Sequence, residues 1–230
     1  MRDIEMRHIA QPVEYRAAQE GVGQLDGYAA VFNRFSQNLG GFVEVVAPGA
    51  FSKSVADGVP VVARYNHDDN FLLGTTEAGT VRLEVDEVGL RYVVDLPDTT
   101  AGRDVSALAK RGDLRYSSFA FHTIDDEWGV TEQGFPLRTL KAVQLVDVAP
   151  VNSPAYRDTT AGVRSLADHL HVEVDVVASA STEELRSLLA GEPIETPPEV
   201  RGEEHEDEGQ GDPHPPVSVR QRLLELENLK

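Results

Sequence analysis

Apolar and polar positions alternate in short runs along the first three quarters of the chain, and this alternation predicts β-strands. The runs are rich in β-branched and aromatic residues and are separated by Gly, Asp or Pro. The segments that we expect to form strands are 23–33, 59–67, 79–86, 89–97, 114–123 and 137–151. Six short strands with turn residues between them favour a mainly β domain, either a barrel or a sandwich.

Two helices are expected among these strands. A short one falls within 48–58, and a longer one falls within 99–112, where Ala101, Val105 and Leu108 lie on one helical face. Gly112 is placed where a helix commonly stops. The second helix therefore leads the chain directly into the strand that begins at Leu114.

The C-terminal quarter has a different pattern. We expect the β domain to span 1–177 and a short helix to follow within 178–190, with Ser181 or Thr182 as its N-cap. Residues 191–216 hold nine acidic residues, one arginine and six of the thirteen prolines, which predicts a disordered acidic linker. Residues 217–230 place their apolar side chains at helical spacing, so we predict an amphipathic helix that needs a partner surface to be stable.

Composition narrows the possible functions. The chain has 230 residues and a formal net charge of −18, which argues against nucleic acid and anionic membrane as partners. No apolar run approaches the length of a membrane span or resembles a signal peptide. Because the sequence contains no cysteine, a catalytic thiol and a zinc–cysteine site are excluded. We expect neither a metal nor a cofactor.

Two adjacent serines stand inside the aromatic strand "LRYSSFAFHT". Because successive strand side chains point to opposite faces, Ser118 shares a face with Ala120 and His122, and Ser117 faces the other side. Only one of the two hydroxyls can then meet a given partner. Both could simply be small strand residues, but a serine nucleophile needs a histidine base that is oriented by a third group.

Most histidines are poor candidates for that base. Three fall where we expect solvated side chains, namely His8, His205 and His214. His169 and His171 alternate in "HLHVEVDVV", which predicts an exposed strand face, and no third ligand stands at convincing spacing for a metal. His122 lies roughly 13 Å from Ser118 along an extended strand, which is too far for a direct hydrogen bond.

His67 remains, at the end of the apolar strand "VPVVARYNH", where it is either a base or an ordinary turn residue. Asp147 is the leading carboxylate, since it is a lone acid within an apolar strand and therefore needs a partner. Asp68 and Asp69 are the alternatives for the orienting carboxylate, but we expect both to be solvated turn residues.

Five motifs in series carry a resemblance to a known family. They are "GYAAVFN", "GGFVEVVAPGAFSKSV", "YNHD", "DTTAGRDVSALAKRGDLRYSSFAF" and "LVDVAPVNSPAY". In order and spacing they resemble the motifs of the prohead (capsid maturation) proteases of tailed bacteriophages, over 23–156. That family is similar in fold to the herpesvirus assembly proteases, which implies a closed β-barrel ringed by short helices.

The resemblance also implies a serine endopeptidase. The family's histidine falls on His67 and its nucleophile on Ser118. Asp147 takes the place of the acidic residue before the proline-ended apolar stretch, although the herpesvirus relatives use a second histidine as the third member. Ala120 stands where the family has a glycine between two aromatics.

The resemblance implies partners and a location as well. They are the major capsid protein with its scaffolding segment and the chain itself through autocleavage, inside the immature head in the host cytoplasm. A homodimer or higher oligomer is possible. Two other functions stay open: a non-enzymatic capsid-assembly module of the same fold, and a plain β-barrel binding domain, which requires no link between Ser118 and His67.

Overall fold

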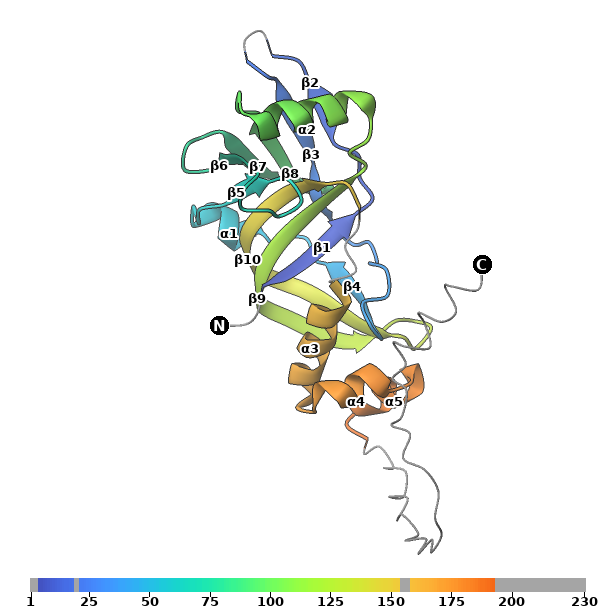
Figure 1. The fold of residues 1–230 in the computed structure, drawn as a ribbon. Helices are drawn as coiled ribbons and strands as arrows, with labels where there is room; N and C mark the ends of the chain where they lie inside the picture. The colour runs from blue at the N-terminus through green and yellow to red at the C-terminus, as the bar shows by residue number, and fades with distance from the viewer. Residues whose placement is uncertain (1–3, 19–20, 154–157, 193–230) are drawn as a thin grey trace, which may run out of the picture. The chain divides into compact units, whose positions relative to one another are not determined.

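The computed structural model describes residues 4–18, 21–153 and 158–192, and Figure 1 labels their helices and strands. The strands are β1 (Glu5–Ile9), β2 (Glu14–Arg16), β3 (Gln24–Val31), β4 (Val43–Val46), β5 (Val62–Arg64), β6 (Leu72–Thr75), β7 (Val81–Val85), β8 (Gly89–Asp95), β9 (Tyr116–Val130) and β10 (Pro136–Val151). The helices are α1 (Ser52–Ala56), α2 (Thr100–Arg111), α3 (Asp158–Leu170), α4 (Val174–Ser179) and α5 (Thr182–Leu189).

The long β9–β10 hairpin organises a six-stranded sheet. Its strand order is β1-β9-β10-β5-β6. The edge of β10 that does not pair with β9 pairs first with β4, at residues 137–140, and then with β5, at residues 147–148. A separate four-stranded sheet has the order β2-β3-β8-β7. Apolar residues of both sheets form one core, to which β8 contributes Tyr92 and β9 contributes Phe119 and Phe121. The serine strand therefore lies against the centre of the core.

The expected closed barrel is wrong. Within the described residues, the larger sheet runs from an edge at β1 to an edge at β6, and the smaller sheet runs from β2 to β7. Closure requires the two edge strands of a sheet to pair with each other, whereas the short edge strands described here each pair only with their inner neighbour. The domain is a mixed α+β fold in which two open sheets pack through a shared core.

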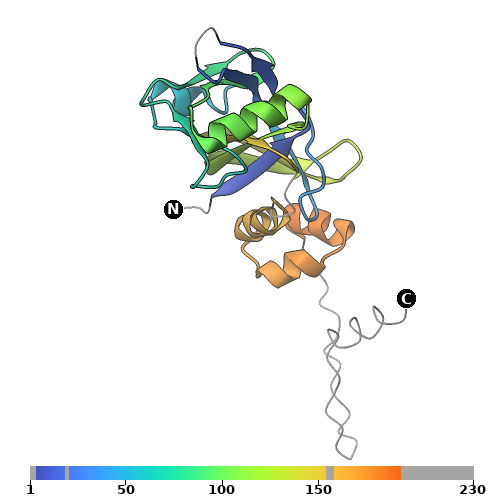
Figure 2. The same cartoon turned by 45° about the horizontal axis from the view of Figure 1, so that its top comes forward.

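The helix expected within 99–112 is confirmed as α2. The Thr99 side chain accepts a hydrogen bond from the backbone N–H of Gly102 at the start, and Gly112 ends the helix in a left-handed conformation with φ 77°. Val105 is buried in the core, while Ala101 and Leu108 pack against it. Figure 2 shows α2 lying across the strands of the domain.

Helices α3, α4 and α5 form a second apolar cluster. Leu166 of α3 and Leu185 of α5 are buried with Leu39 and Phe42, and Trp128 of β9 packs against them. The Ser181 hydroxyl caps α5 in a capping box with Glu184. The packed part of the chain thus extends through α5, and these three helices appear together in Figures 1 and 2.

Four buried charged residues, which we call the ion cluster, join β1 to β4 and β10. Arg7 binds Glu44 at 2.8 Å and Glu5 at 2.7 Å, and Arg138 binds Glu5 at 2.7 Å and Glu44 at 3.1 Å. Burial by itself would raise the pKa of Glu5, but the hydrogen bond from Arg138 and the charges of both arginines outweigh it and lower that pKa to about 2. Each buried charge is therefore compensated.

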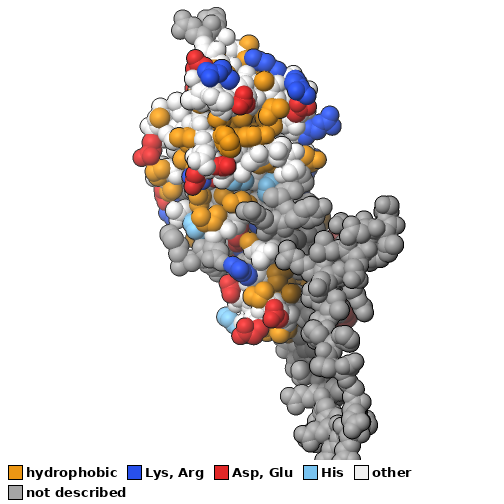
Figure 3. Space-filling model, in the orientation of Figure 1, with side chains coloured by type: hydrophobic (Ala, Val, Ile, Leu, Met, Phe, Trp, Pro, Cys, Tyr) orange, Lys and Arg blue, Asp and Glu red, His pale blue; other side chains and the backbone are white. Residues whose placement is uncertain are grey.

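The acidic linker expected at 191–216, apart from its first two residues, and the helix expected at 217–230 lie outside the described residues. On the face drawn in Figure 3, acidic, basic and apolar side chains of the described part are interspersed. The described helices include none with the length and apolar character needed to cross a bilayer.

Candidate active site

His67 lies in the turn between β5 and β6, and its backbone conformation is unusual. Asn66 and His67 both have positive φ, 56° and 58°, in the left-handed region that residues other than glycine seldom adopt. Two hydrogen bonds tie this turn to the end of β10: the Asn66 N–H donates to the Pro150 carbonyl at 3.2 Å, and the Asn66 side chain accepts from the Asn152 N–H at 3.1 Å. The turn thereby holds the His67 ring beside the sheet.

Ser118 lies near the start of β9, between β1 and β10. It pairs with His8 on one side and with Ala149 on the other, and its side chain is fully buried. The regular pairing of β1 with β9 preserves the alternation of faces, so Ser118 and His8 lie on the same face. The expectation that adjacent serines face opposite sides is confirmed by their separate partners.

Asp147 lies on β10, where it pairs with Ala120 of β9 and with Val62 of β5. The register between β9 and β10 shifts between Leu145 and Asp147, which marks a bulge next to this residue. Only 2% of the Asp147 side chain is exposed. The buried carboxylate predicted from the sequence does have partners, and they come from β5 and from the turn that follows it.

An unbroken chain of hydrogen bonds joins these three side chains. His67 Nδ1 lies 2.6 Å from Asp147 Oδ1, and His67 Nε2 lies 2.6 Å from Ser118 Oγ. Because a carboxylate only accepts, Nδ1 carries the hydrogen in this arrangement, and Nε2 of the neutral ring is left to accept from the serine hydroxyl. Ser118 is thus hydrogen-bonded to a base that is itself oriented by a carboxylate.

Arg64 binds the second carboxylate oxygen of Asp147. Its Nη1 lies 3.1 Å from Asp147 Oδ2 and 3.1 Å from Asp69 Oδ1. Asp69 is 82% exposed and contacts Arg64, whereas Asp147 contacts His67. Of the two acids, Asp147 is therefore the one in contact with the ring, and Arg64 fixes the orientation of its carboxylate.

Ser117 makes a different contact on the core side of the sheet. Its Oγ lies 3.0 Å from the hydroxyl of Tyr92, and both side chains are fully buried. Burial raises the pKa of the Tyr92 hydroxyl above its usual range, while the bond with Ser117 acts in the opposite direction. The Tyr92 hydroxyl therefore stays protonated, and the pair locks β8 to β9 immediately behind Ser118.

The remaining histidines are placed as follows. His8, expected to be solvated, lies in β1 with its ring 6.0 Å from the His67 ring, so that expectation is wrong. His122 lies further along β9, opposite Gln144. His169 lies in the last turn of α3 and stacks on Trp128 at 5.3 Å, and His171 follows that helix, so the strand predicted over these residues is wrong.

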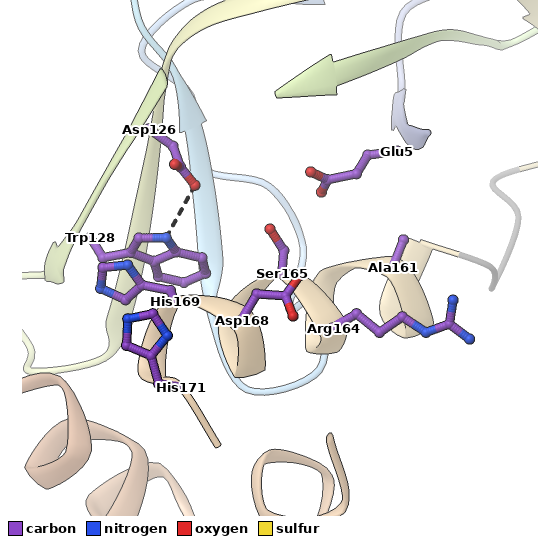
Figure 4. Close-up of a pocket in the computed structure, with 9 residues that line it drawn as sticks. All are labelled: Glu5, Asp126, Trp128, Ala161, Arg164, Ser165, Asp168, His169 and His171. Carbon is purple, nitrogen blue, oxygen red and sulfur yellow. Dashed lines mark hydrogen bonds between the residues drawn. The ribbon is translucent and has the colours of Figure 1, made fainter. Parts of the chain in front are cut away.

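A cavity of about 210 Å³ lies beside α3, and Figure 4 shows the residues that line it. Asp126 accepts a hydrogen bond from the Trp128 indole N–H at 3.1 Å on one side, and Arg164 and Asp168 lie on the helix. Ser118, His67 and Asp147 are not among its lining residues. Within the described part of the chain, no three His, Asp or Glu side chains are grouped as ligands for a metal ion.

Sequence reasoning missed two residues that contact the triad positions, Arg64 and His8. Arg64 interrupts an apolar run three positions before His67, and a charge within a buried strand is a signal that it has a partner nearby. His8 carries no comparable signal, because its neighbourhood depends on the pairing of β1 with a strand more than a hundred residues away. The ion cluster was missed for the same reason.

A serine hydroxyl, a histidine ring and a carboxylate joined in this order form the arrangement with which serine hydrolases activate their nucleophile. The chain belongs to the caudovirus prohead serine protease family, because the profile of that family matches residues 11–172, more than half of the chain. The family resemblance inferred from the five motifs is thereby confirmed.

Among solved structures, the chain is similar to the capsid assembly protease gp21 of bacteriophage T4. The two share 10% sequence identity with a TM-score of 0.44, over 64% of this chain and 96% of that one. An identity and a TM-score this low carry no functional conclusion. Curated protein sequences gave no match.

Proposed function

We propose that this chain is a Ser-His-Asp endopeptidase that cleaves the scaffolding segment of the major capsid protein, and its own chain, inside the immature phage head. Membership of the prohead serine protease family supports the reaction class. The observation that carries the residue assignment is the hydrogen-bond chain from Ser118 through His67 to Asp147, with both contacts at 2.6 Å.

In the first half of the reaction, Ser118 Oγ attacks the carbonyl carbon of the scissile peptide while its proton passes to His67 Nε2. The C–N bond then breaks, and the departing amine takes the proton from Nε2. The product is an ester between the acyl group and Ser118. Asp147 keeps Nδ1 protonated throughout and stabilises the positive charge that the ring carries between these two transfers.

In the second half, water attacks the ester carbonyl and gives its proton to Nε2. The C–O bond to Ser118 breaks, and the proton returns to Oγ, so that the enzyme is restored. Arg64 takes part in neither transfer. It holds Asp147 Oδ2 and thereby keeps Oδ1 directed at the ring.

The domain division belongs to the same proposal. Residues 1–177 form the protease domain, the acidic residues 191–216 act as a tether, and the apolar positions of 217–230 dock on scaffold or shell subunits, so that the enzyme enters the shell during assembly. The tether is then a natural site of self-cleavage, because an extended chain is what a protease accepts.

The test uses the full chain and immature shells that contain the major capsid protein. Mass spectrometry after incubation is expected to find cuts in the scaffolding segment and in the C-terminal tail with the natural sequence, and no cuts with Ser118→Ala. A fluorophosphonate probe, which reacts with activated serines, is expected to modify Ser118. Intact substrates together with an unmodified Ser118 would favour a non-enzymatic assembly module of the same fold.

A further inference from the structure

An extra residue interrupts the pairing of β10 with β9 next to the proposed active site. Leu145 pairs with Phe121, and the next pair along the two strands is Asp147 with Ala120. Val146 is therefore the additional residue of a β-bulge on β10. A bulge of this kind shifts the alternation of side chains, so that the residues after it point to the face opposite to the one that a regular strand would give them.

The bulge decides on which face of the sheet the Asp147 carboxylate lies. Leu145 and its strand partner Phe121 are both buried in the apolar core. In a regular strand, residues two apart share a face, so Asp147 would point into that core beside Leu145. Because of the bulge, Asp147 lies instead on the face of Ser118, where its Oδ1 is 2.6 Å from His67 Nδ1. The hydrogen-bond chain of the proposed site thus depends on this bulge.

The other edge of β10 changes its partner over the same stretch. It pairs with β4 up to Leu140 and with β5 from Asp147, and within the described residues no strand pairs with it between these points. Figure 1 shows α1 beside β10 here. The Ala47 N–H donates to the Leu140 carbonyl at 3.0 Å, and the Val143 N–H donates to the Ala50 carbonyl at 3.0 Å. The segment that leads into α1 therefore takes the place of an edge strand along this part of β10.

Ser54 of α1 makes the contact that lies directly before the bulge. Its Oγ accepts a hydrogen bond from the Leu145 N–H at 2.9 Å, and only 4% of Ser54 is exposed. A buried backbone N–H without an acceptor costs free energy, so this contact favours the bulge at its present position. A bulge that moved along β10 past Asp147 would return the carboxylate to the core face, since a shift of one residue exchanges the faces.

We propose that Ser54 is a positioning residue of the active site: its hydroxyl anchors the β10 bulge and thereby keeps the Asp147 carboxylate on the face of Ser118 and His67. This inference rests on the proposed function, since it explains how the carboxylate assigned there is held in place. Arg64 orients the same carboxylate through direct contact, whereas Ser54 acts through the backbone of β10.

The first test compares two buried serines that have different contacts. Ser54→Ala removes the acceptor of the Leu145 N–H, and Ser106→Ala is the matched control, because Ser106 is 2% exposed in α2 and its hydroxyl donates to the Val22 carbonyl at 3.4 Å. Urea unfolding is expected to show a loss of stability in both variants. Only Ser54→Ala is expected to lower kcat on a cleaved peptide, by about ten- to hundredfold at constant KM. Ser54→Thr keeps the hydroxyl and is expected to recover most of that loss.

The second test follows the ring hydrogen that Asp147 orients. In ¹H–¹⁵N NMR spectra of the histidine rings, the His67 signals, assigned by their absence in His67→Gln, show which ring nitrogen carries the hydrogen. The natural sequence is expected to carry it on Nδ1, as the bond to Asp147 requires. In Ser54→Ala, part of the population is expected to carry it on Nε2, whereas Ser106→Ala is expected to match the natural sequence. A loss of stability alone would not change this distribution.

The two readouts separate this inference from the proposed function. An unchanged kcat and an unchanged His67 ring in Ser54→Ala, or equal losses of kcat in Ser54→Ala and Ser106→Ala, would overturn the inference and leave the protease function intact. If the natural sequence cuts nothing while Ser54→Ala alone changes the His67 ring, the proposed reaction fails and the positioning role stands. If Ser54→Ala does not fold, Ser54→Cys, which weakens the acceptor, is compared with the same control, and the same change is expected at a smaller size.

Discussion

Two polar clusters lie on opposite faces of the same sheet, and β1 contributes to both. Its Glu5 and Arg7 enter the ion cluster on the core side, whereas His8 faces the side of Ser118 and His67. In the ion cluster every buried charge is matched by an opposite charge. In the other cluster, one neutral hydroxyl is hydrogen-bonded to one ring nitrogen.

The difference concerns which groups can move a proton. The arginines of the ion cluster stay charged, so its hydrogen bonds hold strands together without changing state. A histidine between a hydroxyl and a carboxylate can take the hydroxyl proton at one ring nitrogen and pass it on, while the other nitrogen stays bonded to the carboxylate. We therefore expect substitutions in the first cluster to change stability and substitutions in the second to change turnover.

The largest effect is expected from Ser118→Ala. Loss of the proposed nucleophile is expected to remove acylation and to lower kcat by about four to six orders of magnitude, while the melting temperature stays near that of the natural sequence. Ser117→Ala is the matched control: it breaks the bond to Tyr92, and we expect turnover within about tenfold and some loss of stability. Equal loss of activity in both variants would contradict the assignment of a reactive role to Ser118 and a structural role to Ser117.

Asp147→Asn comes next. An amide at this position can donate to Nδ1 and trap the ring in the wrong tautomer, so kcat is expected to fall by about 10⁴ with little change in KM. Asp69→Asn serves as the comparison, since Asp69 contacts Arg64 at the surface and is expected to change kcat by less than about threefold. Stopped-flow and steady-state kinetics on both variants decide between the two acids.

Glu5→Gln tests the ion cluster. The pKa of Glu5 lies at about 2 in the folded protein and at 4.5 ordinarily, so its ionised form contributes about 3 kcal/mol of stability above pH 4.5. Because the folded-state pKa is the lower one, this contribution is lost as the pH falls from about 4.5 through about 2.

Urea unfolding across pH 2–7 measures that contribution. In Glu5→Gln we expect the free energy of unfolding at neutral pH to drop by about 3 kcal/mol and its acid-dependent slope to flatten, with kcat of the folded protein nearly unchanged. Glu14→Gln is the control, because the Glu14 side chain is 76% exposed. A loss of kcat without a loss of stability would contradict a purely structural role for Glu5.

The smallest effect is expected from Arg64→Met, which frees Asp147 Oδ2 without touching the ring. Looser aspartate geometry is expected to lower kcat by about ten- to hundredfold at constant KM, and Arg64→Lys is expected to recover part of the loss because it restores the charge. Arg82→Met removes an exposed pair with Asp95 and should leave kcat unchanged. No rescue by lysine would argue against a positioning role for Arg64.

The parts of the candidate site that depend on neighbouring residues in the sequence were predictable. Ser118 and Asp147 each stand as a polar residue in an apolar strand, and the alternation of side chains along a strand is enough to separate Ser118 from Ser117. Helix α2 was predictable as well, because its cap, its apolar face and its terminal glycine all lie within fourteen residues. In both cases the determining contacts are close in sequence or follow directly from strand geometry.

Other features depend on contacts that the local pattern does not contain. The segment after Leu166 alternates His and Val and resembles a strand, yet it forms the end of α3 and then α4, because Leu166 and Val177 pack into one apolar cluster. β1 is short and carries charges, so nothing in it indicates that it pairs with β9. Whether sheet edges meet to close a barrel is likewise decided by distant strands.

The pairing of β1 with β9 has a consequence for synthesis. Glu5 emerges from the ribosome before Arg138, its partner in the ion cluster, which follows 133 positions later. At about 5–20 residues per second, translation separates the two by several seconds or more, and β1 has no ladder partner until residues 117–121 of β9 have been made. Ser118, His67 and Asp147 cannot come together until the end of β10 has been made, so the hydrogen-bond chain of the proposed active site is absent from the growing chain until then.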